Sequence, residues 1–434
     1  MNRNILYICL LACFLLPAYM QAQSVPTPGA KQTLPIILTN ATIHQGNGKV
    51  IERGDLLIEN GIITEIGRVS KTFKQAESID LKGKHVYPGL ITVNSFLGLE
   101  EINAVRATRD KAEVGLLNAN ARSIISYNTD SRVTPTIRTN GILIAQIAPQ
   151  GAGFTGSSSI VQLDAWNWED ALIKVDDAVY LSWPRMVYKP APWLQKSVEE
   201  LKKDALKNVD KIYETMDAVK AYSQAKDNGK VAKHNLAFDA LVPVIKKEKK
   251  LFIRANSEQQ ILAAIEFKIR YDIDIVIVGG RESYLQTVLL RQYDIPVVLY
   301  KVHQLPVQED DDIDQPFRIP SILQEAGITF CFAMDDMWNE RNLPFQAGTA
   351  AAYGLPKEDA VKSITLNAAK ILGIDDKLGS LEVGKQGTLI VTEGDLLDMR
   401  TSNVVHAFIE GRKVALRSRQ IDLYEKFKQK YADQ

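Results

Sequence analysis

The middle of the chain alternates short apolar runs with amphipathic runs, and this alternation constrains the fold more than any other feature. Residues 250–256 (KLFIRAN) and 274–280 (DIVIVGG) have the length and the β-branched content of buried strands. Between them, residues 258–271 (EQQILAAIEFKIRY) repeat apolar positions at the three-to-four spacing of a helix. Strands that alternate with helices in this way predict parallel β/α units. A chain of 434 residues is long enough to close them into an α/β barrel of the (β/α)8 type.

Blocks of short strands precede and follow this region. The first block contains Asn47-Gly48 and Asn60-Gly61 between apolar runs, and Asn-Gly is typical of tight hairpins. The last block contains residues 387–394 (GTLIVTEG) and 403–411 (NVVHAFIEG), which are bounded by glycines. Each block is too small to fold alone, so we expect both to form one composite β-sandwich beside the barrel. The predicted boundaries are a linker at 23–33, the sandwich at 34–87 and 375–420, the barrel at 88–374 and a tail at 421–434.

The N-terminus reads as a targeting segment. Arg3 precedes an apolar run at residues 5–16, and small and polar residues follow it, which predicts a signal peptide at 1–22. The run is short for a membrane span, so we expect an exported chain with no integral span, periplasmic or extracellular. A lipoprotein attached through Cys13 is the alternative. After cleavage only Cys331 remains, and we expect it to be a buried thiol.

The charge balance gives no electrostatic reason to expect binding to nucleic acid. Lysines and arginines number 52, and aspartates and glutamates also number 52. The acidic run at 309–314 (EDDDID) is interpreted as a solvated loop, with a cation-binding patch as the alternative.

Four stretches together resemble one large family. They are residues 86–99 (VYPGLITVNSFLGL), the region from 332 to 374, residues 378–398 (LGSLEVGKQGTLIVTEGDLLD), and the opening strands from 37 to 67. These stretches resemble the amidohydrolase superfamily, and in particular its imidazolonepropionase-like branch. The resemblance runs from about Leu34 to Val414 and implies a hydrolase of non-peptide or cyclic C–N bonds on a barrel with a small β-sandwich.

The resemblance also implies a divalent metal at the barrel mouth, but the expected ligand positions are changed. The family's His-x-His on the first strand corresponds to Asn94 and Phe96. The strand-five ligand corresponds to Arg254 or Asn256, and the strand-six ligand corresponds to Gly279. We therefore expect a degenerate metal site, with no zinc bound as in the family and no other cofactor.

The family's last-strand aspartate corresponds to Asp335, which is the candidate catalytic base. The alternative is a relic carboxylate, and we expect Arg254 to be its counter-ion. A weaker, oxygen-ligated cation remains open, and its candidate ligands are Asn94, Glu100, Glu101, Asp335 and Asp336. Of the histidines, only His303 follows a barrel strand at a place that faces the mouth.

Two further loops are candidates for ligand contacts. Gly151 and Gly153 lie in a glycine-rich stretch after the strand at 142–147, where backbone N–H groups are able to hold an anion. Trp338 and Arg341 follow Asp335, and both are candidates for gripping a planar or carboxylated ligand. The alternatives are a flexible loop for the glycines and loop packing for Trp338 and Arg341.

Two functions follow from these residues. The first is hydrolysis of a C–N bond with Asp335 as the base and with the metal absent or atypically held. The second is a catalytically inactive relative that binds a small molecule or pairs with an intact homologue. The degenerate set of Asn94, Phe96, Arg254 and Gly279 favours the second for zinc chemistry. The sequence names neither the substrate nor the oligomeric state, and a homo-oligomer stays open.

Overall fold

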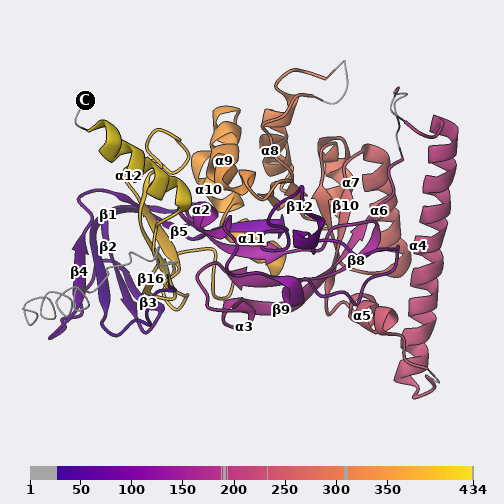
Figure 1. Ribbon diagram of the computed structural model, residues 1–434, viewed down its shortest axis with the longest axis horizontal. Helices are drawn as coiled ribbons and strands as arrows, with labels where there is room; N and C mark the ends of the chain where they lie inside the picture. Colours follow the sequence, from indigo (N-terminus) through magenta and orange to yellow (C-terminus); the bar gives the residue numbers. More distant parts are fainter. Residues whose placement is uncertain are drawn as a thin grey trace, which may run out of the picture.

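The structure is a computed structural model that describes residues 27–186, 188, 192, 194–231, 233–306 and 311–432. The predicted signal peptide at 1–22 lies outside these residues, as do Glu309 and Asp310 of the acidic run. Figure 1 shows a sheet at one end of the molecule, a barrel in the middle and the long helix α4 at the other end. No helix in the described ranges is long and apolar enough to cross a bilayer.

The first sheet joins both ends of the chain, as the sequence predicts. The order of its strands is β16-β15-β14-β5-β1-β2-β3, and β4 pairs with β1. The strands are β1 (Ile36–His44), β2 (Val50–Glu59), β3 (Ile62–Gly67), β4 (Glu77–Asp80), β5 (His85–Pro88), β14 (Leu389–Thr392), β15 (Val404–Ile409) and β16 (Arg412–Lys413). The hairpin between β2 and β3 turns at Asn60 and Gly61, whose φ values of 50° and 81° are those that Asn-Gly tolerates best. This hairpin is confirmed.

The second sheet has eight strands in the order β13-β12-β11-β10-β9-β8-β7-β6, and β13 lies against β6, so it nearly closes into a barrel. The strands are β6 (Leu90–Ser95), β7 (Ile142–Ile147), β8 (Gly153–Gln162), β9 (Leu172–Ser182), β10 (Lys250–Ala255), β11 (Ile275–Gly279), β12 (Val297–Leu299) and β13 (Phe330–Phe332). Neighbouring strands are parallel except that β8 runs antiparallel to β7 and to β9. The expected α/β barrel is confirmed, with a hairpin in place of one β/α unit.

Helices and 3-10 turns connect the strands and cover the barrel (Figure 1). The α-helices are α2 (Thr134–Arg138), α3 (Trp168–Ala171), α4 (Val198–Asp227), α5 (Leu236–Ile245), α6 (Glu258–Tyr271), α7 (Thr287–Gln292), α8 (Gln315–Glu325), α9 (Leu343–Ala352), α10 (Lys357–Ser363), α11 (Leu366–Leu372) and α12 (Arg419–Tyr431). The 3-10 turns are η1 (Arg106–Thr108), η2 (Ser123–Ser126), η3 (Ser283–Gln286) and η4 (Asn339–Asn342).

Helix α4 has one buried apolar stripe. Its buried apolar residues Ala205, Ile212, Met216 and Val219 recur at three-to-four spacing or multiples of it, so one face packs on the barrel. A capping box begins the helix. The Ser197 hydroxyl accepts a hydrogen bond from the N–H group of Glu200, and the Glu200 carboxylate accepts one from the N–H group of Ser197.

Two smaller expectations also have outcomes in the fold. Cys331 is buried in β13 as expected, and burial raises the pKa of its thiol well above the usual range. In the described part of the acidic run, Asp312 and Asp314 form only loose ion pairs with Arg318 at the start of α8. These exposed pairs agree with a solvated segment.

Candidate ligand site at the barrel mouth

The carboxyl ends of the parallel strands meet at one rim of the barrel. The registers place Ser95 opposite Ile147, Ser182 opposite Arg254, and Gly279 opposite Leu299. The antiparallel strand β8 begins at this rim, because Gly153 pairs with Ser182. Barrel active sites occupy this rim, so the side chains that converge here define the candidate site.

Arg254 lies at the centre of this rim. Its Nε and Nη2 donate to Oδ1 of Asn94 over 3.2 and 2.8 Å, which joins β10 to β6 across the barrel. Nη2 also donates to the Pro149 carbonyl at 2.8 Å. Nη1 donates to the hydroxyls of Thr155 at 3.4 Å and Ser182 at 3.3 Å. The sequence predicted both Arg254 and Asn94 as ligand contacts, and the structure brings them together.

The partners of this guanidinium are neutral. Its carbon lies 4.5 Å from the ring centroid of Tyr180, in a cation–π arrangement. Burial lowers the pKa of Arg254 from its usual value, and the nearby hydroxyls of Tyr300 and Tyr180 oppose this shift. In the described part of the chain, no carboxylate forms an ion pair with Arg254. An arginine stays protonated at any ordinary pH, so the mouth holds a cation that has no counter-ion among the described residues.

A second layer of polar side chains supports Tyr180 from below. The Tyr180 hydroxyl donates to Oε1 of Gln146 at 2.7 Å, and Nε2 of Gln146 donates to Oδ2 of Asp177 at 2.8 Å. Ser158 donates to the other oxygen of Asp177 at 2.7 Å. Burial raises the pKa of Asp177, although both hydrogen bonds oppose the shift. These bonds fix the floor beneath Arg254.

Asp335 is the candidate base, and the structure places it away from Arg254. Its carboxylate accepts a hydrogen bond from Lys301 at 2.9 Å, and its side chain is 43% exposed. The expected Arg254–Asp335 pair is therefore wrong: Lys301, which follows β12, is the counter-ion. The sequence missed Lys301 because Arg254 was the only cation placed at an expected ligand position.

Gly279, at the expected strand-six ligand position, lies so close to the Asn256 amide that a side chain there would have to displace it. Its φ is +99°, and a Cβ built there would lie 2.3 Å from Oδ1 of Asn256. Asn94, at a first-strand ligand position, has a φ of 58°. Asparagine tolerates this left-handed conformation better than most residues, which explains this residue at the end of β6.

Phe96, at the other first-strand ligand position, lies beside a lysine. Its ring lies 4.4 Å from Nζ of Lys111, which also pairs with Glu100 at 2.5 Å. Glu100 is thus engaged by a lysine.

The side chains at the mouth do not fit the family's divalent metal. Such an ion needs several His, Cys, Asp or Glu ligands within about 2.0–2.6 Å. Within the described ranges, no group of three or more of these residues is placed to hold an ion. The guanidinium of Arg254 bonds to Asn94, the neighbour from the first-strand position, and its positive charge repels a cation there.

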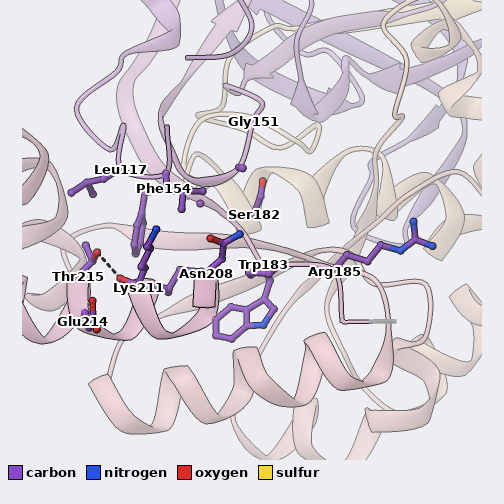
Figure 2. A pocket seen from close by; sticks show the side chains of 15 residues that line it. Leu117, Gly151, Phe154, Ser182, Trp183, Arg185, Asn208, Lys211, Glu214 and Thr215 are labelled. Carbon is purple, nitrogen blue, oxygen red and sulfur yellow. Dashed lines mark hydrogen bonds between the residues drawn. The ribbon is translucent and has the colours of Figure 1, made fainter. Parts of the chain in front are cut away.

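A cleft of about 370 Å³ opens beside this rim, between α4, the end of β9 and the turn from β7 to β8. Gly151 and Gly153 line it, together with Ser182. In Figure 2 the side chains of Asn208 and Lys211 rise from α4 toward this turn. The glycine-rich loop therefore borders a cavity, as its sequence predicted, and whether a ligand binds there stays a prediction.

The other candidates pack into the protein. His303 is held by α9, with Nε2 at 2.6 Å from the Thr349 hydroxyl and Nδ1 at 2.8 Å from the Gln346 amide. Arg341 donates to the carbonyl of Trp338, within their own loop. These contacts agree with loop packing for His303, Trp338 and Arg341. The three residues therefore support the rim.

Glu340 is a buried acid that the sequence did not reveal. It is 1% exposed, and Ser95 donates to its carboxylate at 2.5 Å. Burial raises its pKa to about 8, and the Ser95 hydrogen bond opposes the shift. The sequence carried no signal for it, because a glutamate in a polar 3-10 turn is normally exposed.

Comparisons with known proteins agree with this architecture. The sequence model of the amidohydrolase family matches residues 300–414, from the end of β12 to the last strand. An imidazolonepropionase from Shewanella baltica is 32% identical over 107 residues, which are 24% of this chain and 19% of that protein. The amidohydrolase tasK from Hapsidospora irregularis is 19% identical over 391 residues, 82% of this chain and 39% of that protein.

The resemblance to the amidohydrolase superfamily expected from the sequence is thus confirmed, and the family model covers the C-terminal part of the chain. Its imidazolonepropionase-like character, expected from the sequence, agrees with the curated relatives. The chain spans at most 39% of the length of the curated relatives named above. A solved amidohydrolase from Thermotoga maritima superposes with a TM-score of 0.77 at 24% identity, covering 88% of this chain and 100% of that chain. That likeness establishes the fold of the chain.

Proposed function

We propose that this chain is a ligand-binding member of the superfamily with a degenerate metal site, in which Arg254 binds the anionic group of a small molecule at the barrel mouth. One observation supports this most: the guanidinium of Arg254 is buried among neutral partners. A buried charge without a counter-ion is costly, and an anionic ligand would offset that cost. All five N–H groups of Arg254 already donate to protein groups, so an anionic ligand would replace the longest of these bonds, those from Nη1 to Thr155 and Ser182.

The metal content of the purified chain tests the degenerate site. We expect well below one zinc, manganese or iron per chain by mass spectrometry, for protein prepared without a His tag and without added metal. About one metal ion per chain would contradict the proposal, and it would mean that side chains other than those at the expected positions hold the ion.

Thermal unfolding with small carboxylates tests the ligand. A ligand that binds only the folded state stabilises it by about 2.7 kcal/mol when its concentration is 100 times Kd. We expect N-acetylglycine to raise Tm relative to chloride at the same ionic strength. Arg254→Gln should abolish this increase, whereas Arg281→Gln, a change at an arginine after β11 that is no candidate contact, should preserve it. An equal increase in both variants would disprove the role of Arg254.

Hydrolysis of a C–N bond is the second candidate, and the position of Asp335 favours it. This carboxylate follows β13 at the mouth and is 43% exposed, so water reaches it. The names of the relatives, amidohydrolase and imidazolonepropionase, suggest cyclic and linear amides as first substrates. A screen of such amides, with Asp335→Asn as the control, separates the two functions. Turnover that Asp335→Asn abolishes supports hydrolysis; no turnover above the variant supports binding alone.

A further inference from the structure

The cleft beside the mouth combines an apolar wall with unused polar groups. Leu117 and Phe154 form part of one wall, and Ile212 of α4 contributes to the other. Its volume of about 370 Å³ lies within the range of about 300–1,000 Å³ that is typical of small-molecule sites. A cleft of this kind suits a molecule with an apolar body.

Two side chains of α4 are free to bind a polar group in this cleft. Asn208 and Lys211 are one helical turn apart, so they share a face, and both line the cleft. Figure 2 shows them directed toward the β7–β8 turn, whereas the indole of Trp183 extends away from them. Neither Asn208 nor Lys211 has a side-chain hydrogen bond or ion pair to any described residue. Glu214 is the one acid among the lining residues, and it lies on the same helix.

The cleft and Arg254 share a wall. Ser182 lines the cleft and its hydroxyl accepts a hydrogen bond from Nη1 of Arg254 at 3.3 Å. Gly153, opposite Ser182 in the ladder, brings the backbone close, because a Cβ on it would lie 2.3 Å from the Leu116 carbonyl oxygen. Larger residues at 153 would displace this wall.

We propose that the cleft binds the apolar body of the same ligand whose anionic group binds Arg254, and that Asn208 and Lys211 bind an acceptor or second anionic group on that body. The ligand class is thus an amphiphilic carboxylate with an aromatic or short acyl portion. This inference rests on the proposed function of Arg254, and the experiment below separates the two.

The first probe is 8-anilinonaphthalene-1-sulfonate, which has an aromatic body and a single anionic group. We expect its fluorescence to saturate at one dye per chain. Lys211→Glu should weaken binding at least tenfold, and Leu117→Asp should do the same by placing a charge in the apolar wall. Lys220→Glu is the matched control: nine positions further on, it lies on the opposite face of α4 and should leave binding unchanged. Equal effects of the two lysine variants, or full dye binding by Leu117→Asp, would contradict the proposal that the cleft is the binding site.

The second probe is N-benzoylglycine, which carries a carboxylate on an aromatic amide. We expect it to displace the dye from the native chain, and to need at least tenfold higher concentration in Arg254→Gln. Equal displacement in the native chain and in Arg254→Gln would show that one ligand does not contact both the cleft and Arg254, and so would overturn the inference. A different result would contradict the proposed function of Arg254. That result is equal stabilisation of Arg254→Gln and the native chain by N-acetylglycine, which is too small to need the cleft.

Discussion

Gly279 ends β11 at a place where both conformation and space require glycine. Its φ is +99°, and Oδ1 of Asn256 lies 2.3 Å from the position of a Cβ. Gly279→Ala combines backbone strain with a steric clash, so we expect it to lower the free energy of unfolding by on the order of 2–4 kcal/mol. Chemical denaturation measures this change, and the same clash predicts that a histidine at 279 would not restore the family's ligand.

Gly48→Ala is the matched control for the clash. Gly48 has a similar φ of +94°, but nothing lies within 4 Å of a Cβ built on it. Its substitution therefore tests strain alone and should cost about 1–2 kcal/mol. If the two alanine variants cost the same, Asn256 moves aside freely and the steric argument is incorrect.

Glu340 makes the fold less stable as the pH rises. Its pKa is about 8 in the folded chain against an ordinary value of 4.5. Between these values the unfolded chain is ionised and the folded chain is protonated, so the contribution of Glu340 is fully present below pH 4.5 and is lost as the pH approaches 8. The maximum slope is about 1.4 kcal/mol per pH unit for one such group.

Glu340→Gln should remove this slope. The amide is neutral at every pH and keeps the shape of the acid, so its free energy of unfolding should fall less than that of the native chain between pH 5 and pH 8. Denaturation at four pH values measures the difference. Parallel curves would mean that Glu340 is already ionised, and hence hydrated, in the folded chain.

The residues at the mouth show what the sequence could and could not predict. The resemblance to the amidohydrolase superfamily placed Asn94 and Arg254 at the rim, because they correspond to ligand positions of that family. Their hydrogen bond at 2.8 Å confirms that they meet. The ion-pair partner of Asp335 was not predictable: it is Lys301, which begins a loop whose N–H groups at Val302 and His303 donate to Gln346 of α9. The buried carboxyl of Glu340 likewise depends on tertiary packing.

At the scale of elements, a chain of polar side chains joins the first sheet to α10. Nε2 of His44 on β1 lies 2.9 Å from Nδ1 of His85 on β5, and Nδ1 of His44 lies 2.8 Å from Glu358 on α10. Burial lowers the pKa of His85 below its ordinary value of 6.5, and the charge of His44 adds to this, whereas Asp395 and Glu358 oppose it. The stability that His85 supplies is therefore present above pH 6.5 and is lost as the pH falls through its lowered folded pKa.

His85→Gln should reduce the loss of stability between pH 7 and pH 5. Glutamine cannot take up the proton, so the part of the loss that comes from charging this buried ring disappears. His234→Gln controls for the loss of a histidine, since that side chain is 76% exposed. Thermal unfolding across the range measures the effect, and an unchanged loss in His85→Gln would show that the ring charges without penalty.

Local periodicity decided which elements were predictable. Asn60-Gly61 identified the β2–β3 hairpin, and the three-to-four spacing of apolar residues identified α6, because both signals lie within a few residues. Strand β8 is buried along its whole length and shows no alternation, so its antiparallel direction left no pattern in the sequence. Helix α12 replaces most of the predicted tail at 421–434. The spacing of Leu423, Phe427 and Tyr431 was the signal that could have revealed it.

At the scale of the whole molecule, strand β14 serves two cores at once. Leu389 and Val391 point into the core of the first sheet, whereas Ile390 between them belongs to the core of the barrel. Strand β15 repeats the pattern, with Phe408 in the sheet and Ala407 and Ile409 in the barrel. Side chains that alternate across a strand therefore couple the two units directly. The pairing of both chain ends was predictable from their short strands, but this shared core was not, since it requires knowing which face meets the barrel.

The shared core predicts that a substitution that destabilises the sheet also destabilises the barrel. Phe408 is fully buried, so Phe408→Ala should cost about 3–5 kcal/mol, while Phe427→Ala on α12, at a ring 49% exposed, should cost about 0.5 kcal/mol or less. All five tryptophans lie between residues 166 and 338, so their fluorescence reports on the barrel region alone. We expect Phe408→Ala to shift the fluorescence transition as much as the circular dichroism transition, because the two units unfold together. A shift in circular dichroism alone would mean that the sheet unfolds first and that β14 does not couple it to the barrel.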